Sequence, residues 1–212
     1  MRIEFYAAIK TAEPFLPAGT VIAREQTYVH TFYKKEATAQ QPATSKEEGN
    51  LVAFSGPDFK ATFDKQSGLL TSYLYKKHEY ILNGQGPRPF FWRAPTDNDY
   101  GANLPVRLKA WKEASYQEPK AESFQVTPGS NATTVKVTYR FPQTEARWNI
   151  TYKIYASGVI KVDNRFMAEG DQAPMIPRVG LRMQLPESFT DLTYYGRGPK
   201  ENYRDRRTSQ FI

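Results

Sequence analysis

Short strand-like runs follow one another at close intervals from Leu51 onward, and this rhythm constrains the fold more than any other feature of the sequence. The runs are rich in β-branched and aromatic residues, which favour strands over helices. Aromatic residues make up 14% of the chain, which is enough for a packed core. We expect strands at 51–54, 59–64, 69–75, 122–127, 133–141, 147–156, 159–166, 180–185 and 192–195.

Turn signals separate several of these runs. Gly68 closes a polar turn, and Ser157-Gly158 is a two-residue hairpin signal. Only one helix is predicted, near 104–114, because apolar residues recur there at helical spacing. One helix is too few for an α/β fold, so the sequence predicts an all-β sandwich.

The chain is expected to have three parts. Residues 1–33 contain an alternating run at 2–9 and a second strand-like run at 20–33, and they are predicted to be the end of one β-domain. Residues 34–50 are almost free of apolar side chains and are predicted to form an exposed linker. Residues 51–212 hold the strand-rich remainder.

Composition excludes several classes of protein. The net charge is +7, but the basic residues are scattered, so nucleic-acid binding is not expected. No apolar run is long enough to cross a membrane. Cysteine is absent, which excludes disulfides, thiolate nucleophiles and zinc–sulfur sites. No signal peptide is recognisable at the start, so the compartment stays open.

The most distinctive motif, residues 89–101, is an aromatic strand that runs through a proline into an acidic loop. Side chains of such a loop can cap backbone amides, which is the favoured interpretation. A calcium site is disfavoured because positions 101, 102 and 108 lack the residues of an EF-hand loop. Asp97 and Asp99 could also form a catalytic carboxylate pair, but loop capping is the simpler explanation of both residues. The candidate sugar or domain contacts in this motif are Trp92, Arg93, Asp97, Asn98 and Asp99.

A second charged motif occupies residues 195–206, where two glycines precede a polar stretch. A dinucleotide-binding loop is rejected because no βαβ context surrounds it. The charged side chains could fix a sugar hydroxyl or an adjoining domain, and a self-contained salt-bridged loop explains them equally well. The candidates here are Arg197, Glu201, Asn202 and Tyr203.

Arg178 stands among apolar residues where a strand is expected to begin. A buried arginine needs a partner, so a structural ion pair is favoured over a sugar or domain contact. The two histidines, His30 and His78, lie in no catalytic-triad or metal-ligand pattern. We therefore assign no catalytic residue, no metal ligand and no cofactor to this chain.

Two of these motifs carry a resemblance to a known family. Phe91-Trp92-Arg93-Ala94-Pro95-Thr96-Asp97-Asn98-Asp99 resembles the opening of the last, large β-domain of bacterial β-galactosidases of glycoside hydrolase family 2. Residues 196–206 resemble a second signature of that domain. Residues 1–33 are similar to the last strands of the immunoglobulin-like domain that precedes it.

The resemblance implies an antiparallel β super-sandwich similar in fold to galactose mutarotase, preceded by the last strands of an immunoglobulin-like β-sandwich. Residues 51–212 would be the first part of the super-sandwich. The family's catalytic glutamates lie on a separate barrel, so this chain would be a non-catalytic, inactive part of an enzyme that hydrolyses terminal β-D-galactosides. It would support the catalytic barrel and subunit contacts.

The implied partners are the remainder of the β-galactosidase chain, with its catalytic barrel, and further copies in a homo-oligomer. The substrate of the whole enzyme would be a β-galactoside, and its compartment cytoplasmic or periplasmic. A sandwich interrupted part-way would expose unpaired strand edges and uncovered apolar faces. We therefore expect self-association or a marginal fold, unless the chain closes on itself.

Two other functions stay open. A stand-alone carbohydrate-binding module would stack exposed aromatic side chains on sugars, and Trp92, Trp111 and Trp148 are the obvious candidates. Their apolar surroundings favour the core instead. A mutarotase-like enzyme would need a general base beside a sugar pocket, and no histidine is well placed for that role.

Overall fold

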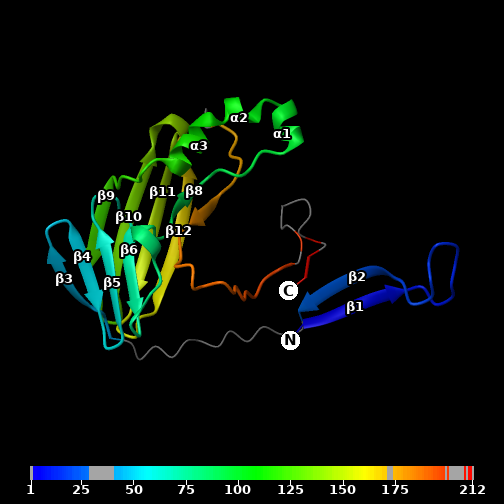
Figure 1. The fold of residues 1–212 in the computed structure, drawn as a ribbon, viewed down its shortest axis with the longest axis horizontal. Helices are drawn as coiled ribbons and strands as arrows, with labels where there is room; N and C mark the ends of the chain where they lie inside the picture. The colour runs from blue at the N-terminus through cyan, green and yellow to red at the C-terminus, as the bar shows by residue number, and fades with distance from the viewer. Residues whose placement is uncertain are drawn as a thin grey trace. The chain divides into compact units, whose positions relative to one another are not determined.

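The computed structural model describes residues 2–28, 41–170, 174–198, 200, 208 and 210–211 of the 212-residue chain (Figure 1). The chain divides into two compact units. One comprises Met1–Glu36 with Thr190–Ile212, and the other comprises Ala37–Phe189. Every strand pair in both units is antiparallel. The all-β prediction is therefore confirmed.

The first unit contains a long hairpin. Strand β1 (Arg2–Ala8) pairs with β2 (Val21–Tyr28), and Arg2 lies opposite Tyr28. The sequence predicts both strands, the first from its alternation of apolar residues and the second as a strand-like run, and positions 29–33 lie outside the described residues. The assignment of this part to an immunoglobulin-like domain stays a prediction. The strand predicted at 192–195 is wrong, because those residues have no regular structure.

The second unit is built from two sheets whose strands are consecutive in the chain. The five-stranded sheet has the order β3-β4-β5-β6-β7, and the four-stranded sheet has the order β12-β11-β10-β9. The bounds of the first sheet are β3 (Thr44–Glu48), β4 (Leu51–Ser55), β5 (Phe59–Asp64), β6 (Leu70–Tyr75) and β7 (His78–Glu79). Those of the second are β9 (Ser123–Thr127), β10 (Thr133–Phe141), β11 (Ala146–Ile154) and β12 (Ile160–Ala168).

The two sheets face each other across an apolar core. Buried and less buried residues alternate along β5 and β10, as expected for strands with one face inward. The ring of Phe63 on β5 lies 5.0 Å from Tyr152 on β11 and 6.1 Å from Phe124 on β9. These contacts make the second unit a β-sandwich.

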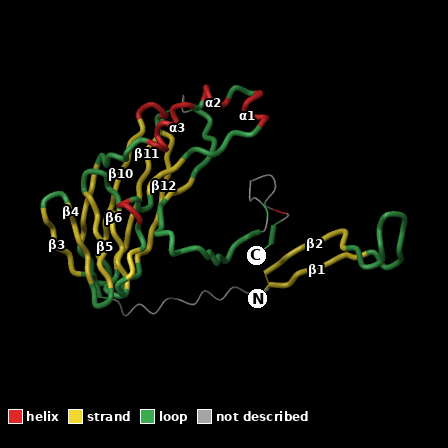
Figure 2. Tube along the Cα trace, viewed as in Figure 1, coloured by secondary structure: helices red, strands yellow, loops and turns green. Residues whose placement is uncertain are grey.

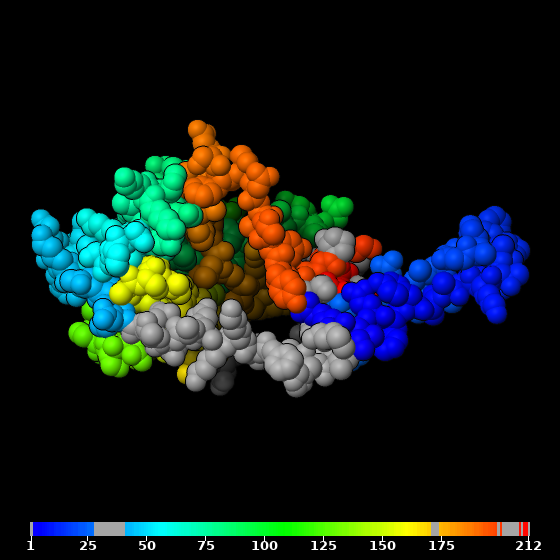
Figure 3. Space-filling view, turned by 90° about the horizontal axis from the view of Figure 1, so that it is seen from below, coloured from blue at the N-terminus to red at the C-terminus, as the bar shows by residue number. Residues whose placement is uncertain are grey.

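The predicted turns form where glycine can take a positive φ. Gly68, at φ +74°, closes the turn before β6. Gly158, at φ +90°, closes the turn between β11 and β12. That second turn packs on the five-stranded sheet, where the Tyr73 hydroxyl donates to the Gly158 carbonyl at 2.7 Å. In Figure 3 its yellow atoms lie against the cyan atoms of the first strands of that sheet.

Three short helices gather at one end of the sandwich (Figure 2). They are α1 (Asp97–Gly101), α2 (Leu104–Arg107) and α3 (Lys109–Tyr116). The sequence pattern predicts a single helix at 104–114. The apolar face was placed correctly, since Leu108 and Trp111 are buried. The helix is nevertheless interrupted at Leu108, whose φ of −109° is not helical.

The remaining elements are short. The strand β8 (Arg88–Phe90) pairs with β13 (Gly180–Arg182), and the 3₁₀ turns are η1 (Leu82–Gly84) and η2 (Pro142–Thr144). The predicted linker at 34–50 needs one correction, because β3 lies within it. Every side chain of β3 is exposed, so the strand has no apolar face from which it could be predicted.

Candidate functional site

The aromatic end of the first motif is part of the core. Phe91 follows β8, and its ring lies 4.9 Å from Trp111, 5.4 Å from Trp148 and 5.8 Å from Phe166. The three tryptophans, Trp92, Trp111 and Trp148, are only 7%, 1% and 2% exposed. This confirms the preference for core positions over exposed sugar-stacking platforms.

The charged part of the motif is a locked loop. Arg93 donates from Nη1 to Asp99 Oδ2 at 2.5 Å and from Nη2 to Asp99 Oδ1 at 2.9 Å. This two-pronged geometry is the strongest that an arginine makes with a carboxylate. Asp99 Oδ2 also accepts from the Thr96 backbone N–H at 2.8 Å, and the Thr96 hydroxyl accepts from the Asp99 N–H. The pair forms a capping box that begins α1.

These contacts fix the charge of Asp99. The hydrogen bonds from Arg93 and from the Thr96 backbone hold the pKa of the Asp99 carboxyl at about 2, below its usual value. A carboxyl with that pKa is ionised at neutral pH and has no proton to donate. Asp99 is therefore unsuited to the role of catalytic acid, and the loop-bracing interpretation of this motif agrees with its geometry.

The other polar residues of the motif point to solvent. Asp97 and Asn98 are exposed on α1, and neither takes part in the Arg93–Asp99 fork. The hollow between this loop, Leu108 and Pro177 has a volume of only about 10 Å³. Such a space holds at most one water molecule, so these residues alone do not enclose a sugar.

Of the predicted site residues, Arg93 and Asp99 are thus in direct contact, whereas those outside this motif are not joined to them in the described structure. Arg178 is exposed, which corrects the expectation of a buried arginine in a structural ion pair. Arg197 is exposed and belongs to the other unit. Glu201, Asn202 and Tyr203 lie outside the described residues.

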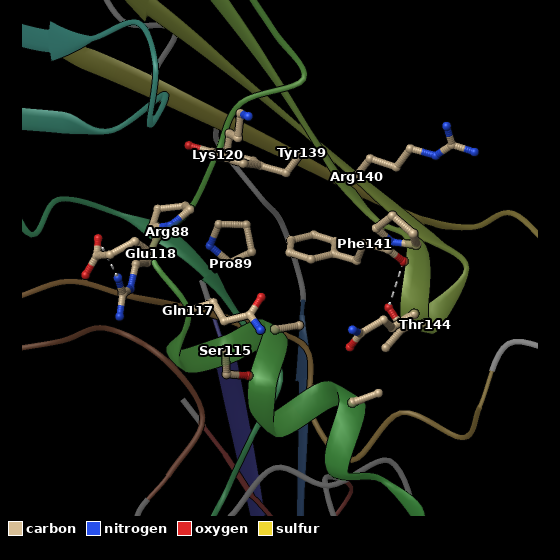
Figure 4. Close-up of a pocket in the computed structure, with 15 residues that line it drawn as sticks. Arg88, Pro89, Ser115, Gln117, Glu118, Lys120, Tyr139, Arg140, Phe141 and Thr144 are labelled. Atoms are coloured by element: carbon tan, nitrogen blue, oxygen red, sulfur yellow. Dashed lines mark hydrogen bonds and ion pairs between the residues drawn. The ribbon is translucent and has the colours of Figure 1, made fainter.

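A pocket that no sequence motif indicated lies between α3 and the end of β10 (Figure 4). Its volume is about 310 Å³, at the lower end of the range for small-molecule sites. Pro89 and Phe141 form apolar walls. Arg88 and Glu118 lie side by side at one end of the pocket, whereas the Arg140 guanidinium points away from it (Figure 4).

Arg88 is the unusual member of this pocket. It is 8% exposed, and its Nη1 lies 3.8 Å from Glu118 Oε2, beyond hydrogen-bonding distance. Within the described part of the chain, Nη1 has no hydrogen-bond partner. The only sequence signal for a special arginine was its place between Pro87 and Pro89. Among the described residues that line the pocket, Glu118 is the only carboxylate.

Glu79 is a second polar centre that sequence analysis missed. Its Oε1 accepts from the backbone N–H groups of Tyr73, Tyr80 and Ile81 at 2.8–3.0 Å, and its Oε2 accepts from the Ser72 hydroxyl. Burial alone would raise the pKa of Glu79, but these hydrogen bonds outweigh it and lower the pKa. The carboxylate therefore holds together the end of β6 and the segment after β7.

No helix in the described ranges is long and apolar enough to cross a membrane. Across those same ranges, no three histidine or acidic side chains come together as a metal site would require.

Residues 55–212 match the family described as beta galactosidase small chain. The chain is 34% identical over 171 residues to a β-galactosidase of Priestia megaterium, covering 80% of this chain and 16% of that protein. It is 30% identical over 213 residues to a β-galactosidase of Streptococcus thermophilus, covering 99% and 20% respectively. A β-galactosidase of Clostridium acetobutylicum is 35% identical over 156 residues, covering 73% and 17%. The chain thus spans a fifth or less of the length of these relatives.

Proposed function

Since this chain belongs to the beta galactosidase small chain family, we propose that it is a non-catalytic structural part of a β-galactosidase that hydrolyses terminal β-D-galactosides. In this proposal the enzyme belongs to glycoside hydrolase family 2, and the sandwich resembles galactose mutarotase in fold. The chain supports a catalytic barrel carried by the remainder of the enzyme and contributes to contacts between subunits. It needs no cofactor of its own.

The Arg93–Asp99 fork in the loop at residues 93–99 is the observation that carries this proposal. A retaining glycosidase needs two carboxyl groups about 5 Å apart, one of which can act as an acid. In the loop, Asp99 is hydrogen-bonded to Arg93 and keeps a pKa of about 2. Its negative charge therefore stabilises the loop, and the carboxylate is not available as a catalytic acid. The pocket beside α3 has a single carboxylate among its described lining residues. Both features support a scaffold in preference to a hydrolytic centre.

The exposed residues of the loop supply the proposed contact surface. Asp97, Asn98 and Tyr100 project from α1, which the Arg93–Asp99 fork holds rigid. A rigid polar loop at one end of a sandwich suits the contact with another domain. We extend the same proposal to Arg178 and Arg197, which are also exposed. A sugar contact at these residues would require surface from the remainder of the enzyme.

A stand-alone carbohydrate-binding module is the weaker alternative. Its usual platforms are exposed aromatic side chains, whereas the three tryptophans of this chain lie in the core. A mutarotase would require a general base, and the described pocket residues include no histidine. Neither alternative is favoured by a specific contact.

The test is hydrolysis of a chromogenic β-galactoside in two settings. The purified chain alone is expected to show no turnover. A chimaera of the Streptococcus thermophilus enzyme, in which this chain replaces the matching 213-residue stretch, is expected to hydrolyse the substrate. The same enzyme with that stretch deleted is the negative control and is expected to be inactive.

Hydrolysis by the chain alone would show that its residues include a catalytic pair, and the scaffold proposal would be wrong. An inactive but folded chimaera would contradict the supporting role. In the active chimaera, Asp97→Ala with Asn98→Ala tests the contact surface and is expected to lower activity. Lys136→Ala, on the exposed face of β10, is the matched control and is expected to leave it unchanged.

A further inference from the structure

The strand β12 forms one edge of the four-stranded sheet and pairs with β11 on one side (Figure 1). Within the described ranges, no strand pairs with its other side. Five consecutive residues, 161–165, are exposed, in contrast to the buried–exposed alternation of β10 and β11. An unpaired strand edge of nine residues offers its backbone groups to a further strand.

The side chains of β12 divide between two faces. Val162 and Phe166 lie opposite Tyr152 and Trp148 of β11, so they share the apolar face of the sheet. Val162 is still 36% exposed there, whereas its cross-strand neighbour is fully buried. Asp163 and Arg165 alternate with them and lie on the outer face. Lys161 lies on the outer face as well, and its Nζ is 3.7 Å from Asp163 Oδ2. The edge therefore presents mainly apolar groups on one face, and two positive charges and one negative charge on the other.

We propose that β12 pairs with β12 of a second copy of this chain, antiparallel and about a two-fold axis at Asn164. Asn164 is the midpoint of the strand, so all nine residues find a partner in this register. Asp163 of each copy then lies opposite Arg165 of the other, which gives two opposite-charge pairs on the outer face. On the apolar face, Val162 of each copy lies opposite Phe166 of the other. Strand addition of this kind joins two sheets into one continuous sheet.

The charges also disfavour the two neighbouring registers. A shift of the axis by one residue, to Asp163 or to Arg165, would place that side chain opposite its own copy. Like charges directly opposite each other destabilise a pair of strands. The free edge of the other sheet behaves differently: pairing of β3 with itself about its midpoint would oppose Lys46 to Lys46. Charge thus favours β12 over β3, and its nine residues offer a longer ladder than the five of β9, the other edge of the same sheet.

The proposal is independent of any β-galactosidase activity, because it is tested by the mass of the particle in solution. Sedimentation velocity of the intact chain over a range of concentrations is expected to show a monomer–dimer equilibrium. Asp163→Arg and Arg165→Asp each place like charges opposite one another twice. Each is expected to raise the dimer dissociation constant by about tenfold or more.

Mixing the two purified variants tests the proposed charge pairs most directly. An equimolar mixture of Asp163→Arg and Arg165→Asp restores both opposite-charge pairs between unlike chains and is expected to form a heterodimer. The double variant, with both changes in one chain, is expected to form a homodimer again. Lys136→Glu reverses an exposed charge on β10, inside the same sheet, and is expected to leave the wild-type equilibrium unchanged.

Thermal unfolding by circular dichroism shows whether each variant is folded, which is expected because both side chains are exposed. A wild-type chain that stays monomeric at the highest concentration would overturn the proposal and leave the edge to a strand of another polypeptide. A dimer that tolerates both charge reversals would also overturn it, because the contact would then lie elsewhere. Dimerisation lost in both single variants and regained on mixing would establish the β12 pair.

Discussion

The helical end of the sandwich and its centre differ in whether their buried polar side-chain groups have hydrogen-bond partners. At the helical end, the indole N–H of Trp111 donates to the Pro174 carbonyl at 3.3 Å. In the centre, the hydroxyls of Tyr139 and Tyr152 are buried and have no hydrogen-bond partner among the described residues. Burial raises the pKa of both hydroxyls above the usual tyrosine value, so both stay protonated.

The cause of this difference lies in the backbone. Loops and short helices leave some carbonyl groups without a backbone partner, and such groups can accept from a nearby side chain. Between two complete sheets, the backbone groups are already used by the ladders, so the polar tip of a long side chain finds nothing to bind. The centre is thus stabilised by buried area, and the helical end by area together with specific hydrogen bonds. Four predictions test this contrast.

Trp111→Ala should have the largest effect. It removes the largest buried side chain of α3, together with its contacts to Phe91 and Phe166. We expect a loss of about 3–5 kcal/mol in the free energy of unfolding, measured by urea denaturation. Lys109→Ala on the exposed face of the same helix is the control and should cost less than about 0.5 kcal/mol. Equal effects of the two changes would contradict the importance of the aromatic cluster.

Gly68→Ala should have the next largest effect, because it introduces both backbone strain and a steric clash at the centre of the sandwich. The residue has φ +74°, and an added Cβ would lie 2.6 Å from the Tyr139 hydroxyl. We expect a loss of about 1–3 kcal/mol from strain alone, with the clash in addition. Gly49→Ala is the matched control, since φ is +57° there and no atom lies within 4 Å of the added Cβ. A loss at Gly68 no larger than that at Gly49 would show that Val137 and Tyr139 move aside without cost.

Tyr152→Phe should stabilise the protein. It removes a buried hydroxyl that has no partner in the described structure, and we expect a gain of about 1 kcal/mol in the free energy of unfolding. Tyr73→Phe should have the opposite sign. The Tyr73 hydroxyl donates to the Gly158 carbonyl, and its removal should cost about 1 kcal/mol. Thermal denaturation of both variants beside the wild type measures the two changes in stability. A destabilised Tyr152→Phe would show that the hydroxyl has a hydrogen-bond partner.

The acid dependence of stability should show the smallest effect, and it belongs to the helical end. The pKa of Asp99 is about 2 in the folded protein, below its usual 3.8. A lowered carboxyl pKa stabilises the fold above the usual value, and this contribution is lost as the pH falls toward 2. Wild type should therefore lose stability across that interval more steeply than Asp99→Asn. Parallel curves in unfolding experiments from pH 5 to pH 2 would argue against the Arg93 fork in solution.

Much of the fold follows from local patterns in the sequence. The alternation of apolar residues predicted β5, β10 and β11 to within one or two residues, because each strand buries one face. It could not predict β3, since an edge strand with both faces in solvent needs no apolar side chain. The strand predicted at 192–195 rested on apolar residues that are exposed in the structure, such as Leu192 and Tyr195.

The candidate site was predicted in part. The loop-bracing role of the acidic motif followed from residue types, and the Thr96–Asp99 spacing was the signal for the helix that sequence analysis missed. A five-residue helix is too short to show a periodic pattern. Arg178 was expected to be buried because of its apolar neighbours, but Met175 and Val179 are themselves exposed. The Arg88 pocket joins residues from distant parts of the chain, which no local motif reveals.

The order of strands within the sheets has a consequence for how the chain folds. Each sheet is assembled from neighbours in sequence, and most of the connections between those neighbours are short turns. Such contacts form quickly because only short loops have to close. We expect the two meanders to appear early and separately in refolding. The slower step should then be their docking, in which Phe63 on β5 meets Tyr152 on β11 from a position 89 residues away in the chain.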